Sequence, residues 1–176
     1  MQTVKCEIKG LRPYFFSKPT EDKTPRTDAA AIKVAKNRVY FNGNLFAPSR
    51  QIKWSMITAV EMAKMQIQRS TKRAKDLMKT TLLTVSPNEL YFKPKMTMNN
   101  VQVGKIWTNL DMGKGKFVHC AYIDLPWGLE FDLLVGEMFE PDWIKEALEN
   151  AGILACIGGK RPDNGAFEVV RYEVLA

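Results

Sequence analysis

A glycine-rich segment near the end of the chain constrains the fold more than any other feature. The residues 149–152 are typical of a helix end, and a short apolar run, 153–157, follows them. The chain then enters a loop, 158–165, and we expect a closing strand over 166–174. Glycine accepts positive φ and lets another backbone come close. The segment therefore suits either a tightly packed turn or a loop that approaches a phosphate backbone.

Two cations inside this loop suggest a ligand for it. Lys160 and Arg161 follow the glycine pair directly and put positive charge where backbone amides are exposed. The candidate nucleic-acid-binding residues here are Gly158, Gly159, Lys160, Arg161 and Gly165. Ordinary turn chemistry is the alternative, because a lone glycine loop is not a specific signal.

A second basic stretch, 64–79, carries the largest local charge excess, with six Lys and Arg residues against Asp76. Its candidate contact residues are Arg69, Lys72, Arg73 and Lys75. A solvated helix face would explain the same charges. Further along, Tyr91 and Phe92 lie among lysines and could stack on nucleic-acid bases. They could equally close a small core of their own.

Composition narrows the class of protein. The 176 residues fit one domain, 1–176, and the net charge of +7 favours polyanionic partners. No long apolar run is present, so we expect neither a secretory signal nor a membrane span, and we expect a cytoplasmic protein. One histidine and three dispersed cysteines, Cys6, Cys120 and Cys156, do not predict a metal site. We expect no cofactor.

The hydrophobic periodicity predicts an α+β fold. Val4, Cys6 and Ile8 alternate with polar residues as in a half-buried strand, and Ile52, Met56 and Val60 recur at helical spacing. The expected order is strand 3–9, helix 49–65, strand 117–125, strand 129–136, helix 141–151 and strand 166–174. This β-α-β-β-α-β order is typical of a ferredoxin-like or RRM-like antiparallel sheet with its helices on one face.

Two further expectations concern the middle of the chain. The strands 117–125 and 129–136 should form a hairpin joined by Pro126 to Gly128. The region of about 82–116 reads as an insertion that resembles a β-hairpin and has a glycine-rich tip at 111–116. The last strand should pair beside the first, which would put the glycine loop near the C-terminal side of the first long helix and its basic extension.

Three motifs resemble a known family. They are Gly10-Leu-Arg-Pro13, Asn42-Gly-Asn-Leu-Phe-Ala-Pro-Ser49 and Ile157-Gly-Gly-Lys-Arg-Pro-Asp-Asn-Gly-Ala-Phe167. With the β-α-β-β-α-β order, they resemble small phage and prophage proteins similar to the RAMP superfamily of CRISPR effectors. Ala166 departs from that pattern, in which a basic residue often precedes the phenylalanine. The resemblance implies binding of RNA or single-stranded DNA, with copies of the protein along the strand or a CRISPR-type complex as further partners.

The sequence favours binding over catalysis. Some RAMP relatives cut RNA with a histidine base, and the single histidine here is His119, on an expected strand with no fixed partner. We therefore predict a non-catalytic nucleic-acid-binding protein of phage type. One alternative is a phage protein that binds, mimics or blocks a host CRISPR complex. Another is a metal-independent RNA endonuclease that uses His119.

Overall fold

The protein is a mixed α+β structure. The computed structural model describes residues 1–21, 25–109 and 115–175. Its strands are β1 (Gln2–Gly10), β2 (Tyr14–Phe15), β3 (Phe41–Asn42), β4 (Asn44–Pro48), β5 (Leu83–Ser86), β6 (Glu89–Tyr91), β7 (Gln102–Asn109), β8 (Gly115–Ile123), β9 (Gly128–Val135) and β10 (Phe167–Leu175). Its helices are α1 (Asp28–Asn37), α2 (Ser49–Met62), α3 (Thr71–Lys79), α4 (Pro141–Asn150), the short 3-10 turn η1 (Met98–Asn100) and the π-helical turn η3 (Ala151–Ala155).

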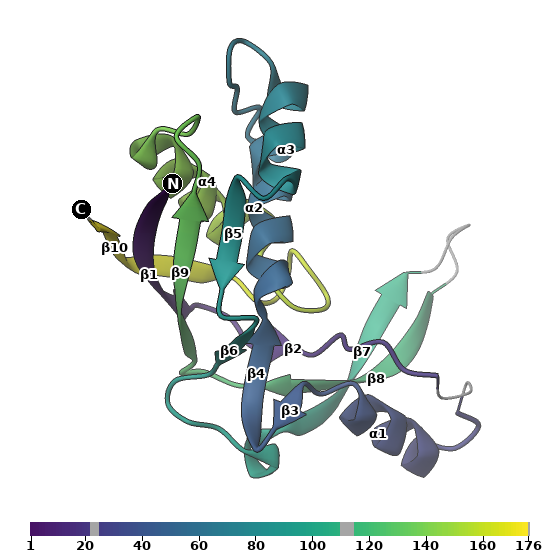
Figure 1. Ribbon diagram of the computed structural model, residues 1–176. Helices are drawn as coiled ribbons and strands as arrows, with labels where there is room; N and C mark the ends of the chain where they lie inside the picture. Colours follow the sequence, from purple (N-terminus) through teal and green to yellow (C-terminus); the bar gives the residue numbers. More distant parts are fainter. Residues whose placement is uncertain (22–24, 110–114, 176) are drawn as a thin grey trace.

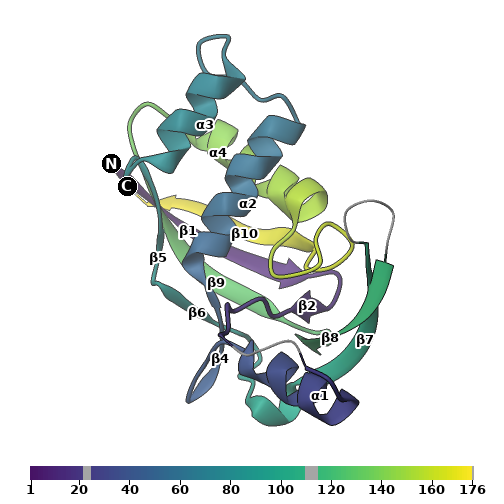
Figure 2. The same cartoon turned by 90° about the vertical axis from the view of Figure 1, so that its right-hand side faces the viewer.

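The main sheet has four antiparallel strands in the order β10-β1-β9-β5. The last strand therefore pairs with the first, as expected. Alternate residues of β1, such as Val4 and Ile8, are buried, while Lys5 and Lys9 on the opposite face are exposed. α2 and α4 pack on the buried face (Figure 1), and the view in Figure 2 shows both helices in front of the sheet.

The second strand of this sheet is β5, not the expected strand 117–125. Thr84 of β5 pairs with Leu134 of β9, so the region 82–116 contributes to the main sheet and is not an insertion. The expected hairpin between 117–125 and 129–136 is also wrong, because β8 and β9 lie in different sheets. Trp127 explains the separation. Its side chain is only 1% exposed, so the connection enters the core instead of forming a surface turn.

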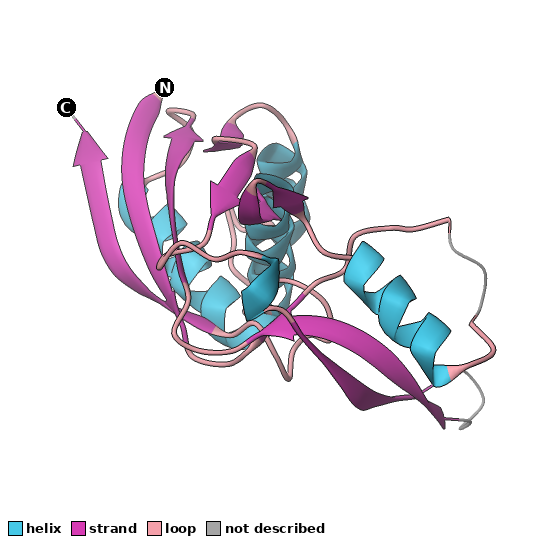
Figure 3. Ribbon diagram, turned by 90° about the horizontal axis from the view of Figure 1, so that it is seen from below, coloured by secondary structure: helices cyan, strands magenta, loops and turns pink. Residues whose placement is uncertain are grey.

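A second sheet, β2-β8-β7, extends away from the main sheet as a long ribbon made by β7 and β8. α1 lies along this ribbon (Figure 3). Thr27 caps α1 by accepting a hydrogen bond from the backbone N–H of Ala30, in place of the expected cap Asp28. Most of the glycine-rich tip expected at 111–116 lies outside the described residues.

A third small sheet, β3-β4-β6, lies at the N-terminal end of α2. The expected turn at Asn42 to Asn44 is confirmed, because Asn42 pairs with Asn44 across Gly43. α2 follows β4 directly. It ends at Met62, one turn earlier than expected.

The two turns that hold glycine at positive φ provide a test of the fold. Gly165 has φ +73, and a Cβ there would lie 1.8 Å from the carbonyl oxygen of Ile157. Gly43 has φ +71 with open space around it. We expect Gly43→Ala to cost about 1 kcal/mol and Gly165→Ala to cost more than about 3 kcal/mol of unfolding free energy. Urea titration measures both. Equal losses would contradict the close packing at Gly165.

Candidate functional site

A basic cleft of about 740 Å³ lies between α1, the β7–β8 ribbon and the glycine loop. Its ionisable lining is strongly cationic. The cations that we use to define it are Arg26, Arg38, Lys105, Lys116 and Lys160, with His119 beside them. Among the described lining residues, Asp28 is the one carboxylate. Five cations against one acid make this the place where the excess charge of the chain is concentrated around a concave surface.

Secondary structure brings these cations together from distant parts of the chain. Arg26 precedes α1 and Arg38 is its C-cap, so the helix carries one cation beyond each end. Lys105 and His119 lie directly opposite each other in the β7–β8 ladder, which puts both side chains on one face. Ala35 of α1 is buried, and α1 packs on β8, which fixes the helix beside the ribbon.

The one acid in the cleft is already paired. The ammonium of Lys105 lies 2.9 Å from the Asp28 carboxylate. The hydrogen bond from Lys105 lowers the pKa of Asp28, so this carboxylate stays ionised at neutral pH. Among the described residues, no carboxylate forms an ion pair with Arg26, Arg38 or Lys116. Their charge is therefore available to an anionic ligand.

The glycine loop is a packed turn rather than an open cradle of amides. The N–H of Gly159 donates to the carbonyl of Phe15 over 2.7 Å, and the N–H of Gly165 donates to that of Pro13 over 2.9 Å. A Cβ at Gly158 would lie 2.6 Å from the Phe15 carbonyl oxygen. The three predicted glycines thus allow the loop to pack against β2, and the packing explains their positions without a phosphate.

The two cations of the loop point to different sides of it. Lys160 lines the basic cleft, where its ammonium donates to the hydroxyl of Thr108 on β7. Arg161 lines a second cavity of about 410 Å³ with Arg50, Gln51 and Trp54. The predicted pair therefore does not act on one point. Its members flank the ridge formed by the loop and β2.

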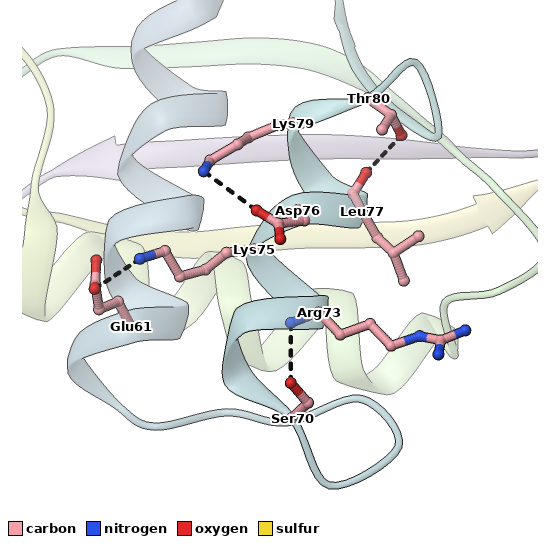
Figure 4. Close-up of polar contacts among 8 residues, drawn as sticks. All are labelled: Glu61, Ser70, Arg73, Lys75, Asp76, Leu77, Lys79 and Thr80. Atoms are coloured by element: carbon pink, nitrogen blue, oxygen red, sulfur yellow. Dashed lines mark hydrogen bonds and ion pairs between the residues drawn. The ribbon is translucent and has the colours of Figure 1, made fainter.

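The basic stretch 64–79 forms α3 and the turn before it (Figure 4). Lys75 is neutralised by an ion pair of 2.6 Å with Glu61 of α2. The backbone N–H of Arg73 donates to the Ser70 hydroxyl, which caps the helix. The side chains of Arg69, Lys72 and Arg73 belong to exposed residues.

The expected continuity between α3 and the glycine loop is wrong. The loop lies beside Gln51 and Trp54, in the N-terminal half of α2. α3 packs beside the C-terminal end, at Glu61. α2 separates the two, because a helix of 14 residues is about 21 Å long.

The predicted aromatic pair divides between core and surface. Phe92 is 2% exposed, and its ring lies 5.0 Å from that of Tyr14 and 6.0 Å from that of Trp127. It cannot stack on a base without unfolding. Tyr91 is exposed, and its hydroxyl donates to the Glu89 carboxylate. The alternative, that this region packs into a core, therefore holds for Phe92.

The open face of the main sheet does not resemble a base-stacking platform. Across the strands, Lys5 faces Asp132 and Glu173, and Glu7 faces Arg171 and Glu130. Of the aromatic residues in the four strands, Phe131 and Phe167 are buried with the core, and the Tyr172 hydroxyl reaches the carbonyl of Pro141 at the start of α4. The RRM-like mode of stacking on the sheet is therefore not available here.

No other chemistry is prominent in the residues that the structure describes. His119 lies in the basic cleft, and no hydrogen bond to it is found there. In the described ranges, no three His, Cys, Asp or Glu side chains are placed to hold a metal ion. No described helix is both long and apolar enough to cross a membrane.

Comparison with protein-family models and with curated proteins finds no match for the chain. The geometry of the cleft therefore carries the functional argument.

Sequence reasoning missed most of the cleft. Of its cations only Lys160 was a candidate, because the other four lie far apart in the chain and no one of them stands in a basic run. Two exposed aromatics were also missed, namely Phe117 beside the cleft, at 65% exposure, and Trp54 in the second cavity, at 53%. A usable signal existed for Trp54, because it lies one helical turn after Arg50 on the polar side of α2.

The contrast between Tyr91 and Phe92 is directly testable. Phe92→Ala removes a buried ring, so we expect it to lower the unfolding free energy by about 3–5 kcal/mol. Tyr91→Ala removes an exposed ring and should change it by less than about 1 kcal/mol. Thermal and urea unfolding measure the difference. A stable Phe92→Ala protein with impaired ligand binding would contradict the core assignment.

Proposed function

We propose that the chain is a non-catalytic nucleic-acid-binding protein that holds the backbone of RNA or single-stranded DNA in the basic cleft. The observation that carries this proposal is the lining of one cavity of about 740 Å³ by five Lys and Arg residues and one Asp among the described residues. Phosphate contacts from such cations supply most sequence-independent affinity for nucleic acids. We further propose that the protein acts in the cytoplasm.

An aromatic side chain strengthens the case for a single strand. Phe117, on the β8 side of the cleft, is 65% exposed, and its ring packs edge-on against Trp107 with centroids 5.0 Å apart. Proteins that bind single strands combine a cationic groove with exposed rings on which bases stack. A cleft lined by Lys116 and Phe117 offers both kinds of contact on neighbouring residues.

A finer fold assignment supports the same class of function. The chain order β1-α2-β5-β9-α4-β10 and the sheet order β10-β1-β9-β5 agree with a ferredoxin-like arrangement. We propose that arrangement, and with it a RAMP-like protein of phage type, on the three sequence motifs. The α3 cations Arg69, Lys72 and Arg73 remain a predicted second surface, separate from the cleft.

Replacing cleft cations should weaken nucleic-acid binding. The variant Arg38→Gln with Lys116→Gln removes two cleft charges. We expect a loss of roughly ten- to a hundredfold in affinity for a single-stranded oligonucleotide at moderate salt and a fall of about 2 in the slope of log K against log salt. Fluorescence anisotropy over a salt series measures both quantities.

Two double variants make the same charge change elsewhere. Lys33→Gln with Lys36→Gln lies on α1 outside the cleft lining and should leave affinity within about twofold. Lys72→Gln with Arg73→Gln tests α3. Equal loss in all three variants would indicate a general effect of net charge, and a loss confined to the α3 variant would move the interface away from the cleft.

The nuclease alternative rests on the position of His119 in the cleft. We expect His119→Ala to keep the folded circular dichroism spectrum and to retain binding, because no partner positions the imidazole for proton transfer. The assay is cleavage of labelled RNA without metal ions. Cleavage by the wild type that disappears in His119→Ala would replace the binding-only proposal with an endonuclease.

A further inference from the structure

The second cavity has a chemical character of its own. It occupies about 410 Å³ on the other side of the ridge made by β2 and the glycine loop. Arg50 and Trp54 come from successive turns of α2, and Arg161 comes from the loop. No carboxylate is found among the described lining residues. An exposed indole between two guanidinium groups suits a ligand that has both a flat aromatic ring and negative charge.

A buried tyrosine fixes the polar group at the base of this cavity. The Tyr14 hydroxyl lies 2.7 Å from Gln51 Oε1, and Tyr14 is fully buried. Burial raises the pKa of Tyr14, so its hydroxyl keeps its proton and donates to Oε1. The amide orientation is thereby set, and its NH₂ group remains as a donor. The structure gives that group no acceptor among the described residues. A ligand in the cavity can therefore receive hydrogen bonds from Gln51 as well as from the arginines.

The second cavity and the basic cleft are contiguous. Ser17 lines both, and Lys160 and Arg161 are consecutive residues that line one each. A strand whose phosphates lie in the cleft can thus continue over the ridge into the cavity. Trp and Arg are also common at protein interfaces. The absence of acids from the described lining and the continuity with a cationic cleft favour nucleic acid as the occupant.

We propose that the second cavity is a nucleotide subsite, in which one base of the bound strand stacks on Trp54 while Arg50 and Arg161 hold its phosphate. Gln51 donates a hydrogen bond to the same nucleotide. This inference rests on the proposed function, because the strand that supplies the base is the one held in the basic cleft. The subsite would bend the strand over the ridge and would give the cleft a contact that depends on a base.

The test separates stacking from charge. Oligouridylate and oligothymidylate carry bases, and an abasic oligodeoxynucleotide of equal length carries the phosphates alone. We expect Trp54→Ala to lower affinity for the base-bearing strands by roughly five- to a hundredfold, as for other base–aromatic stacks, and to leave abasic binding unchanged. Trp54→Phe should retain most of the affinity. Met62→Ala, an equally exposed apolar side chain on the same helix, should change neither.

Each outcome decides the inference. Unchanged binding of the base-bearing strands by Trp54→Ala would overturn the subsite, leave the proposed function intact and point to a protein ligand for the cavity. Equal loss for abasic and base-bearing strands would also overturn it, because the effect would not be stacking. A wild-type protein that binds none of the strands would overturn both the subsite and the proposed function. Circular dichroism confirms that each variant is folded.

Discussion

A buried aromatic cluster joins the two halves of the molecule. The ring of Tyr14 lies 5.1 Å from that of Phe16, 5.0 Å from that of Phe92 and 5.8 Å from that of Trp127. These four side chains come from β2 and its extension, from the segment after β6 and from the connection between β8 and β9. The cluster fixes the ribbon sheet against the main sheet. Both cavities depend on this junction, because β2 and the glycine loop form the ridge between them.

The junction also explains why the glycines and the cations of the loop have different roles. Glycine at 159 and 165 lets the loop donate hydrogen bonds to the backbone of residues 13 and 15. The loop is held rigidly, and its two cations are presented on opposite sides of the ridge. Electrostatic binding gains from such rigidity because less side-chain and loop entropy is lost when a phosphate arrives.

The sequence predicted the elements whose pattern is local. The alternation in β1 and the helical spacing in α2 are confirmed, and so is the pairing of β10 with β1. The second strand of the main sheet was missed, because four residues of β5 carry little periodicity and their partner is set by register with β9. The hairpin 117–136 was wrong because a buried tryptophan at its expected turn, Trp127, takes the connection into the core. The cleft was missed for a related reason: its cations meet only when α1 lies on the ribbon.

The most direct measurement of nucleic-acid binding at the cleft is ultraviolet crosslinking of the wild-type protein to a single-stranded oligonucleotide, with mass spectrometry of the adducts. Aromatic side chains in contact with bases should carry the adducts. The account predicts them in the β8 peptide that contains Phe117, with high salt abolishing the crosslink because phosphate contacts hold the strand. Adducts confined to α3 or to the open face of the main sheet would contradict it.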